Sequence, residues 1–267
     1  MKLDFYMQTP ESPFWKNGTL FGDALRLISS CGYDGVEFLP HCLEKMQVQD
    51  ITRLTVDMGL EVICVATGFL NTRYGLSISH PNESARRVAV ENVIKCIGCA
   101  ADLNAKFVSI GLVRGKIVHG LSYERGLTNI AESLTECGDY AEERGIRLLV
   151  EPENSYETAF IHTVEESVDM LRRIGLGNLG LLIDSYHMNL EEVDIPTAMR
   201  AGLGRILHVH LADSNRLAPG MGHFDFRLFL EGLREIRYNS FLGIEVSPSP
   251  SLDIAIRESM AFIKRIT

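Results

Sequence analysis

The feature that most constrains this chain is a regular alternation of short apolar runs with longer segments of helical periodicity. The apolar runs expected as strands are residues 3–7, 35–40, 61–66, 106–111, 148–151, 181–184, 206–210 and 242–245. The segments expected as helices are residues 19–31, 42–58, 82–103, 122–144, 163–174, 191–202, 225–237 and 252–266. Alternation of this kind predicts a parallel sheet covered by helices.

Eight strand–helix units favour closure of the sheet into a barrel. The length of 267 residues is close to the roughly 250 residues of a typical (β/α)8 barrel. We therefore predict a single (β/α)8 TIM barrel domain over residues 1–267. A doubly wound open sheet is the alternative, but no glycine-rich dinucleotide fingerprint opens the first helix.

The charge balance excludes two classes of partner. With 26 Lys and Arg against 35 Asp and Glu, the formal net charge is −9. Nucleic acids and anionic membranes both require basic surface, so neither is expected as a partner. The N-terminus has no apolar signal-peptide core, and no run of about 18 apolar residues occurs. We expect a cytoplasmic location, with free thiols and with Cys96 and Cys99 packed on one helix face.

Four consecutive predicted strands end on metal-ligating residue types: Glu151, Asp184, His210 and Glu245. One acid at a strand end is usually a solvated cap, but four at equivalent positions are hard to explain that way. In a (β/α)8 barrel these positions meet at one mouth, where active sites lie. Three carboxylates and one imidazole suit a hard divalent cation, so we predict one Mn²⁺, Mg²⁺ or Co²⁺ ion there.

Further polar and aromatic residues lie near the same mouth. Glu157, His187 and Arg216 each follow one of the four strand ends within six residues. Their side chains can accept from and donate to hydroxyl and carbonyl groups, although each alone would be an ordinary surface residue. Tyr6 and Trp15 could form a wall against the apolar face of a sugar, and ordinary packing is the alternative for Trp15.

Two other features are interpreted as structural or mobile. Glu37 ends the second predicted strand, and His208 shares a strand face with His210, one layer lower in the barrel. Both are expected as interior polar partners. The loop at residues 219–223 contains two glycines, so it is expected either as a mobile lid or as an ordinary turn.

The chain resembles the sugar isomerase/epimerase superfamily, whose xylose isomerase-like barrel is shared with zinc-dependent apurinic endonucleases. The resemblance runs from Gly32 to Glu245. It is sharpest to the D-tagatose and D-psicose (allulose) ketose 3-epimerases, at residues 184–192, at residues 208–222, and in the spacing of Glu151 and Glu157. Residues 151–154 and 211–214 depart from the pattern of a close member.

This resemblance implies a function and roles for the site residues. Glu151, Asp184, His210 and Glu245 would hold one divalent ion, with Mn²⁺ preferred, and the two glutamates would also be the acid–base pair. By the same resemblance, Glu157, His187 and Arg216 would bind the first hydroxyls and the keto oxygen. The implied reaction is epimerisation of a free ketose at C3 through an enediolate. We also expect a homodimer or homotetramer.

Two alternatives use the same residues. One is a sugar-phosphate or hydroxypyruvate-type isomerase. Residues 247–250, Ser-Pro-Ser-Pro, offer few amides for a phosphate, but Arg114 and Lys116 could supply another phosphate site. The other alternative is a sugar-binding barrel without catalysis. It is disfavoured because a binding protein has no need of an acid–base pair such as Glu151 and Glu245.

Overall fold

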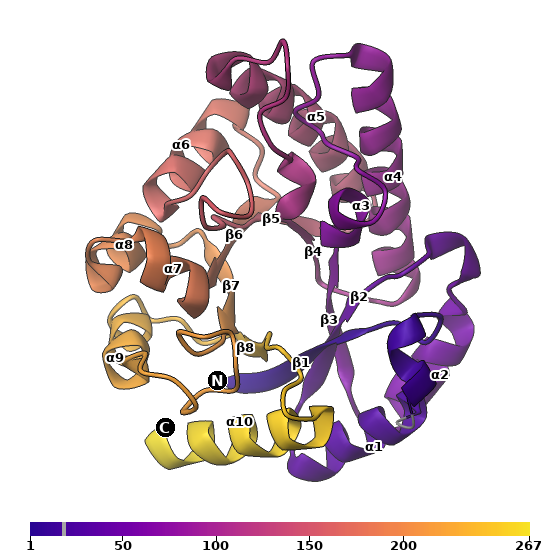
Figure 1. The fold of residues 1–267 in the computed structure, drawn as a ribbon, viewed down its shortest axis with the longest axis vertical. Coiled ribbons are helices and arrows are strands. Elements are labelled where there is room, and N and C mark those ends of the chain that lie inside the picture. Colours follow the sequence, from indigo (N-terminus) through magenta and orange to yellow (C-terminus); the bar gives the residue numbers. More distant parts are fainter. Residues whose placement is uncertain (18–19) are drawn as a thin grey trace.

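The barrel predicted from the alternation is the fold observed in the computed structural model, which describes residues 1–17 and 20–267. Within these residues, parallel strands pair in sequence order from β1 to β8, and β8 pairs back with β1. Figure 1 looks into the ring of strands, with the helices arranged around its outside. The strands are β1 (Lys2–Gln8), β2 (Gly35–Leu39), β3 (Glu61–Ala66), β4 (Phe107–Ile110), β5 (Arg147–Val150), β6 (Leu179–Asp184), β7 (Ile206–Leu211) and β8 (Phe241–Ile244).

The α-helices follow the strands along the chain. They are α1 (Phe21–Cys31), α2 (Val48–Asp57), α3 (Gly68–Thr72), α4 (Glu83–Asp102), α5 (Tyr123–Glu143), α6 (Val164–Ile174), α7 (Ser185–Glu191), α8 (Ile195–Ala201), α9 (Phe226–Glu235) and α10 (Leu252–Ile266). Short 3₁₀ helices also lie in loops of the described chain: η1 (Pro13–Asn17), η2 (Leu43–Lys45) and η3 (Leu112–Arg114).

Two predicted helices are divided in the structure. The helix expected over residues 42–58 consists of η2 and the shorter α2. The helix expected over 191–202 is replaced by α7, which starts directly after β6, and by α8. Asp194 caps α8 by accepting from the Thr197 N–H at 2.9 Å, and Pro196, which has no N–H, suits only a first turn. The predicted start of the first helix at residue 19 lies outside the described residues.

Helix starts follow the capping chemistry in the sequence. Asn82 caps α4 by accepting from the Ala85 N–H at 2.9 Å. Thr163 caps α6, and the Glu166 carboxylate accepts from the Thr163 N–H, which completes a capping box. Gly175 ends α6 with a φ of 77°, a left-handed conformation that glycine adopts without steric cost.

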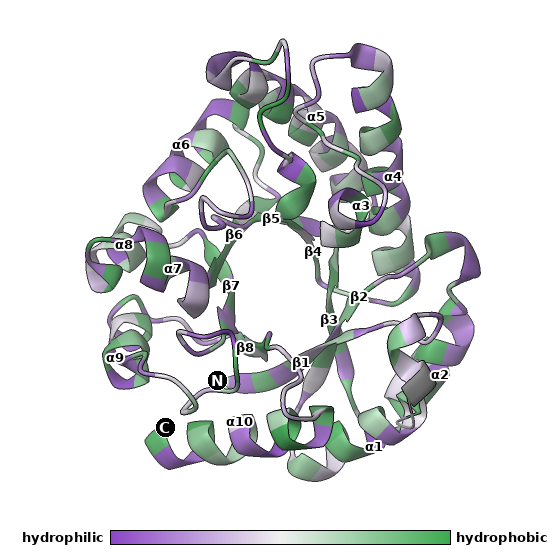
Figure 2. Ribbon diagram, in the orientation of Figure 1, coloured by the Kyte–Doolittle hydropathy of each residue, from purple (hydrophilic) through white to green (hydrophobic). Residues whose placement is uncertain are grey.

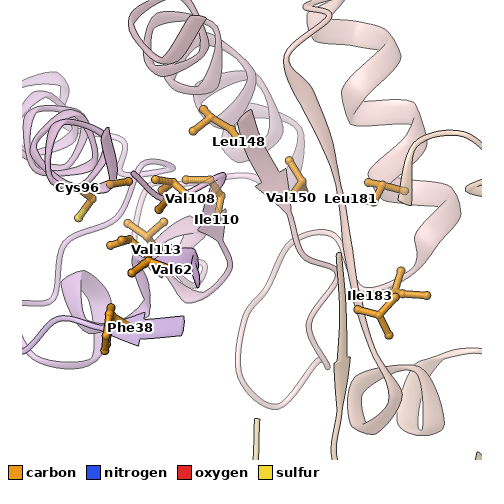
Figure 3. Close-up of a cluster of buried hydrophobic side chains, with 14 of the residues drawn as sticks. Phe38, Val62, Cys96, Val108, Ile110, Val113, Leu148, Val150, Leu181 and Ile183 are labelled. Atoms are coloured by element: carbon orange, nitrogen blue, oxygen red, sulfur yellow. The ribbon is translucent and has the colours of Figure 1, made fainter. Parts of the chain in front are cut away.

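Strand residues pack into two separate apolar layers. The larger layer lies between strands and helices, and Figure 3 shows strand residues such as Leu148 and Val150 in it, with Cys96 of α4. The smaller cluster fills the barrel interior and includes Leu149 and Leu182. Figure 2 shows the matching pattern of apolar strands and two-sided helices. The barrel is therefore a packed scaffold that positions the strand ends at its mouth.

The structure also describes the state of the cysteines and the hydropathy of the helices. All six cysteines are free thiols, and Cys96 is fully buried. None of the helices in residues 1–17 and 20–267 combines the length and hydropathy that a membrane span requires.

Candidate active site

The four predicted ligand-type residues meet at one mouth of the barrel. Glu151 follows β5, Asp184 ends β6, His210 lies near the end of β7, and Glu245 follows β8. Each residue has one possible metal-ligand atom that lies within 4.8 Å of the corresponding atoms of the other three. His210 Nδ1 lies 2.9 Å from Glu245 Oε2, 3.9 Å from Glu151 Oε1 and 4.0 Å from Asp184 Oδ2. We call these four residues the ligand cluster.

The orientation of the His210 ring suits a cation. Its Nε2 lies 3.1 Å and 3.2 Å from the two carboxylate oxygens of Glu37, so Nε2 carries the proton and donates it. The opposite nitrogen, Nδ1, is buried and faces the three other members of the cluster, with Glu245 Oε2 at 2.9 Å but without the alignment of a hydrogen bond. A histidine fixed by a carboxylate, with its free nitrogen among three other carboxylates, is the usual arrangement of a metal-bound imidazole. The residues present therefore fit a divalent ion.

The electrostatics of the cluster favour a positive charge. Burial would lower the pKa of His210, but Glu37 and Glu245 outweigh it and raise that pKa well above its usual range. Burial and the carboxylates of Glu153 and Glu245 raise the pKa of Glu151 well above its usual range. Acidic groups that hold protons this strongly also attract a cation placed among them.

Arg216 lies against two members of the cluster. Its Nη1 donates to Asp184 Oδ2 at 2.6 Å, and its Nη2 donates to Glu245 Oε2 at 2.7 Å. The guanidinium also stacks over the Tyr186 ring at 4.9 Å. Burial would raise the pKa of Glu245, but Arg216 and His210 outweigh it and hold that pKa below its usual range. The two candidate proton carriers, Glu151 and Glu245, thus differ in proton affinity.

His187 lies on α7. The prediction from sequence placed it in a loop after the strand that ends at Asp184. Asp184 starts this helix by accepting from the Tyr186 N–H at 2.7 Å. His187 Nδ1 accepts from the backbone N–H of Asn154 at 3.3 Å and from its side-chain amide at 2.8 Å. The proton of this imidazole therefore lies on Nε2, which is 3.9 Å from Glu151 Oε1. Burial lowers the pKa of His187, so the ring is a neutral donor.

Glu157 contacts the side chain of Asn154, because Asn154 Nδ2 donates to Glu157 Oε1 at 3.1 Å as well as to His187. Asn154 was not predicted as a site residue. Asn154 lies in residues 151–154, which depart from the pattern of the ketose 3-epimerases. The resemblance therefore did not indicate that the Asn154 amide bridges two other side chains.

Tyr6 and Trp15 differ in whether they contact the cluster. The Tyr6 ring meets the His210 ring edge-on, with 5.9 Å between centroids. Trp15 is buried between Phe14 and Phe21, and its indole N–H donates to the Thr9 carbonyl at 2.9 Å. Both line a pocket of about 100 Å³ beside the mouth, so Trp15 has mainly a packing role in this structure.

The suggested phosphate site at Arg114 is wrong. Arg114 is fully buried, and its guanidinium donates to three backbone carbonyls and, at 3.4 Å, to Glu153. Lys116 is exposed and donates to the Tyr156 carbonyl at 3.1 Å. Glu153, which the sequence reasoning missed, lies beside Glu151 and His187. Burial raises the pKa of Glu153 to about 8, although Arg114 opposes this shift.

The comparison with known families agrees with this barrel. The model of the xylose isomerase-like TIM barrel family matches residues 25–266. The chain belongs to this family. The expected resemblance and barrel class are therefore confirmed.

Several curated proteins similar to this chain are named as sugar epimerases. An L-ribulose 3-epimerase from Mesorhizobium japonicum is 25% identical over 239 residues, which are 88% of this chain and 78% of that protein. A D-psicose 3-epimerase from Enterocloster bolteae is 36% identical over 113 residues, 42% of this chain and 38% of that protein. The chain thus spans less than half of this second relative. Because epimerases are isomerases that act on carbohydrates, these names confirm the expected enzyme class.

A solved structure gives the same architecture. The crystal structure of D-allulose 3-epimerase from Methylomonas sp. in complex with D-allulose matches with a TM-score of 0.85 at 21% identity. The match covers 100% of this chain and 98% of that chain. At this identity the likeness establishes the shared fold.

Proposed function

We propose that this chain is a divalent-metal-dependent ketose 3-epimerase that acts on free ketoses. The observation that carries the proposal is the ligand cluster, in which two glutamates from β5 and β8 lie near one imidazole nitrogen. The 3-epimerase names of the relatives support the position of attack.

Glu151, Asp184, His210 and Glu245 would hold the ion, and Mn²⁺ is the preferred metal, with Mg²⁺ or Co²⁺ as alternatives. When bound, a divalent ion supplies positive charge that stabilises the negative charge developing on a ketose oxygen as the proton leaves.

The two glutamates would move the proton. One carboxylate removes the proton from C3; the electron pair of the C3–H bond forms the second C2–C3 bond, and the π pair of the C2 carbonyl moves onto its oxygen, which gives an enediolate. The other glutamate, in its protonated form, delivers a proton to C3 on the opposite face while the oxygen's electron pair re-forms the C2 carbonyl, which inverts the configuration. General acid–base catalysis needs both groups within reach of one carbon. The proximity of Glu151 and Glu245, which each place one carboxylate oxygen within 4.8 Å of the other ligand atoms of the cluster, supports this assignment.

Three neighbouring side chains would orient the sugar. His187 would donate its Nε2 proton to the keto oxygen or a hydroxyl, because Asn154 occupies Nδ1. Arg216 would donate to oxygens beside the cluster, and Glu157 would accept from a hydroxyl. Tyr6 would cover the apolar face of the sugar, since its ring already packs against His210, with Trp15 supporting the adjoining wall.

Free ketoses are favoured over phosphates. Arg114, the strongest candidate for a phosphate contact after β4, has its guanidinium committed to buried carbonyls. The loop after β8 contains Ser247, Pro248, Ser249 and Pro250, and proline has no N–H to donate. Homo-oligomerisation and a cytoplasmic location stay predictions.

Solvent labelling tests the reaction. During early turnover of a ketohexose in D2O with Mn²⁺, epimerised product should carry deuterium at C3, while recovered substrate remains largely protiated. Deuterium only at C1 or C2 would indicate an aldose–ketose isomerase instead. Sugar binding without any exchange would indicate a non-catalytic barrel.

A further inference from the structure

The loop between β7 and α9 carries Arg216 in an uncommon backbone conformation. Its φ is 61°, in the left-handed region that residues with a Cβ rarely adopt. Such a conformation persists only where the surroundings determine it. The Arg216 N–H donates to the Asp213 carbonyl at 2.8 Å, and the Arg216 carbonyl accepts from the Ser247 N–H at 2.7 Å. The Asp213 N–H donates to the Leu217 carbonyl at 2.9 Å, which closes the turn.

The Asp213 side chain ties the start of this loop to its end. Its Oδ1 accepts from the backbone N–H groups of Ser214 at 2.7 Å and Phe224 at 3.0 Å. Its Oδ2 accepts from the Gly220 N–H at 2.7 Å. The residue is buried, with 1% of its surface exposed. Burial would raise the pKa of Asp213, but these backbone donors outweigh it and hold the pKa below its usual range.

The two loop glycines are packed against neighbours, so they are poor candidates for hinges. A Cβ at Gly222 would lie 2.2 Å from Asp213 Oδ1. A Cβ at Gly220, where φ is 92°, would lie 2.3 Å from the Phe262 ring. The backbone can pass this close to the carboxylate only without a side chain at Gly222. The lid interpretation of residues 219–223 therefore gives way to a loop wrapped around one buried carboxylate.

We propose that Asp213 is a positioning residue that sets the Arg216 guanidinium against Asp184 and Glu245. The turn closed by Asp213 directs the Arg216 side chain, whose two contacts of 2.6 Å and 2.7 Å then define where a sugar oxygen meets a donor. Asp213 has no place in the ligand cluster. Its role in sugar binding rests on the proposed function, whereas its role in holding Arg216 does not.

Side-chain NMR of the protein with diamagnetic Mg²⁺ tests the positioning role directly. Two carboxylate contacts should slow rotation of the Arg216 guanidinium and separate its Nη signals, which are assigned by their absence in Arg216→Ala. Asp213→Asn should average these signals, because an amide can no longer accept from all three backbone donors. Gly222→Ala should do the same while keeping the carboxylate, and it serves if Asp213→Asn does not fold. Unchanged Arg216 signals in the folded variant would overturn the proposal.

A matched control separates positioning from simple loop stability. Asp225 lies at the end of the same loop and caps α9 through the N–H groups of Arg227 and Leu228. Asp225→Ala should lower thermal stability and leave the Arg216 signals separate. Averaged signals in this control too would show that any loosening of the loop suffices, which would overturn a specific role for Asp213.

A double-mutant cycle tests the consequence for the sugar. Asp213→Asn should lower kcat/KM for a ketose by up to the order of 10²-fold, as expected for a misplaced contact group. In an Arg216→Ala background the same substitution should have little further effect, because both act through one side chain. A loss of equal size in both backgrounds would overturn the proposal. If the wild type turns over no ketose, the proposed function fails, and the NMR measurement still decides the role of Asp213.

Discussion

Glu37 on β2 holds His210 on β7 from across the barrel interior, with carboxylate oxygens 3.1 Å and 3.2 Å from His210 Nε2. The same carboxylate accepts from His208 Nε2 at 2.7 Å. Burial would raise the pKa of Glu37, but the two imidazoles outweigh it and hold that pKa well below its usual range. An ionised Glu37 accepts from His210 Nε2, so Nδ1 faces the ligand cluster and is the nitrogen that would bind an ion.

Replacing Glu37 by Gln should weaken Mn²⁺ binding. An amide accepts a weaker hydrogen bond than a carboxylate, so the His210 ring loses both orientation and basicity. Loss of such a partner typically lowers metal affinity about 10–100-fold. Calorimetric titration measures this, with Glu61→Gln as control, because Glu61 forms exposed ion pairs with Lys2 and, at 2.7 Å, with Lys106, and lies outside the ligand cluster. Equal affinities in the two variants would contradict the role of Glu37.

Changes to the ligands themselves should have larger effects. Asp184→Asn and His210→Ala each remove one charged or strongly basic donor from the cluster. Stoichiometric Mn²⁺ binding, followed by calorimetry, should fall in both variants while the circular dichroism of the barrel is preserved. Unchanged binding in both variants would remove these residues from the proposed metal site.

Glu151→Gln and Glu245→Gln should abolish most turnover. Each variant keeps a possible oxygen ligand but loses a group that can take up a proton. Loss of a general base typically lowers the rate about 10²–10⁴-fold. Both variants should still bind the ketose, as equilibrium dialysis can establish. Near wild-type kcat in either one would exclude that glutamate as a proton carrier.

The free sugar should be preferred to its phosphate. We expect kcat/KM for a ketohexose to exceed that for the same ketohexose phosphate, because the loop after β8 provides few amides and Arg114 is buried. Measuring both substrates at one Mn²⁺ concentration decides the point. A clear preference for the phosphate would transfer the proposal to a sugar-phosphate epimerase or isomerase.

Arg114 should instead matter for stability. Arg114→Met leaves the Glu153 carboxylate and several buried carbonyls without their donor, and breaking a buried pair costs about 3–5 kcal/mol. Urea unfolding measures this loss. The control is Arg200→Met, which removes an exposed pair with Glu235 at 3.1 Å and should cost about 1 kcal/mol or less. Equal losses would mean that Arg114 contributes no more than a surface charge.

Local sequence pattern was sufficient to predict the barrel and the positions of the four cluster residues. Strand and helix periodicity are local properties, and in a closed parallel barrel all strand ends of one kind share one mouth. This is why Asp184 and Glu245 could be placed together although 61 positions separate their numbers in the sequence.

The remaining site features depend on contacts between distant segments. Arginine is usually a surface residue, and the burial of Arg114 depends on the carbonyls of Ile110, Phe160 and Ile161 and on the Glu153 carboxylate. The carboxylate of Asp213 is satisfied by backbone N–H groups, which leave no signature in residue identity. Asn154 joins His187 to Glu157 through an amide whose partners lie on two elements. None of these contacts follows from periodicity or spacing.

The residues of the ligand cluster all come from one half of the chain. The ligand cluster comes entirely from β5 to β8 and the positions directly after them. The loops after β1 to β4 border the same mouth, and none of their described residues belongs to the ligand cluster. On the proposed function, substitutions in these loops would change the surface that meets a sugar and leave Glu151 and Glu245 in place. Residues 40–47 and 67–81 are thus natural segments to randomise when redesigning which sugars this scaffold accepts.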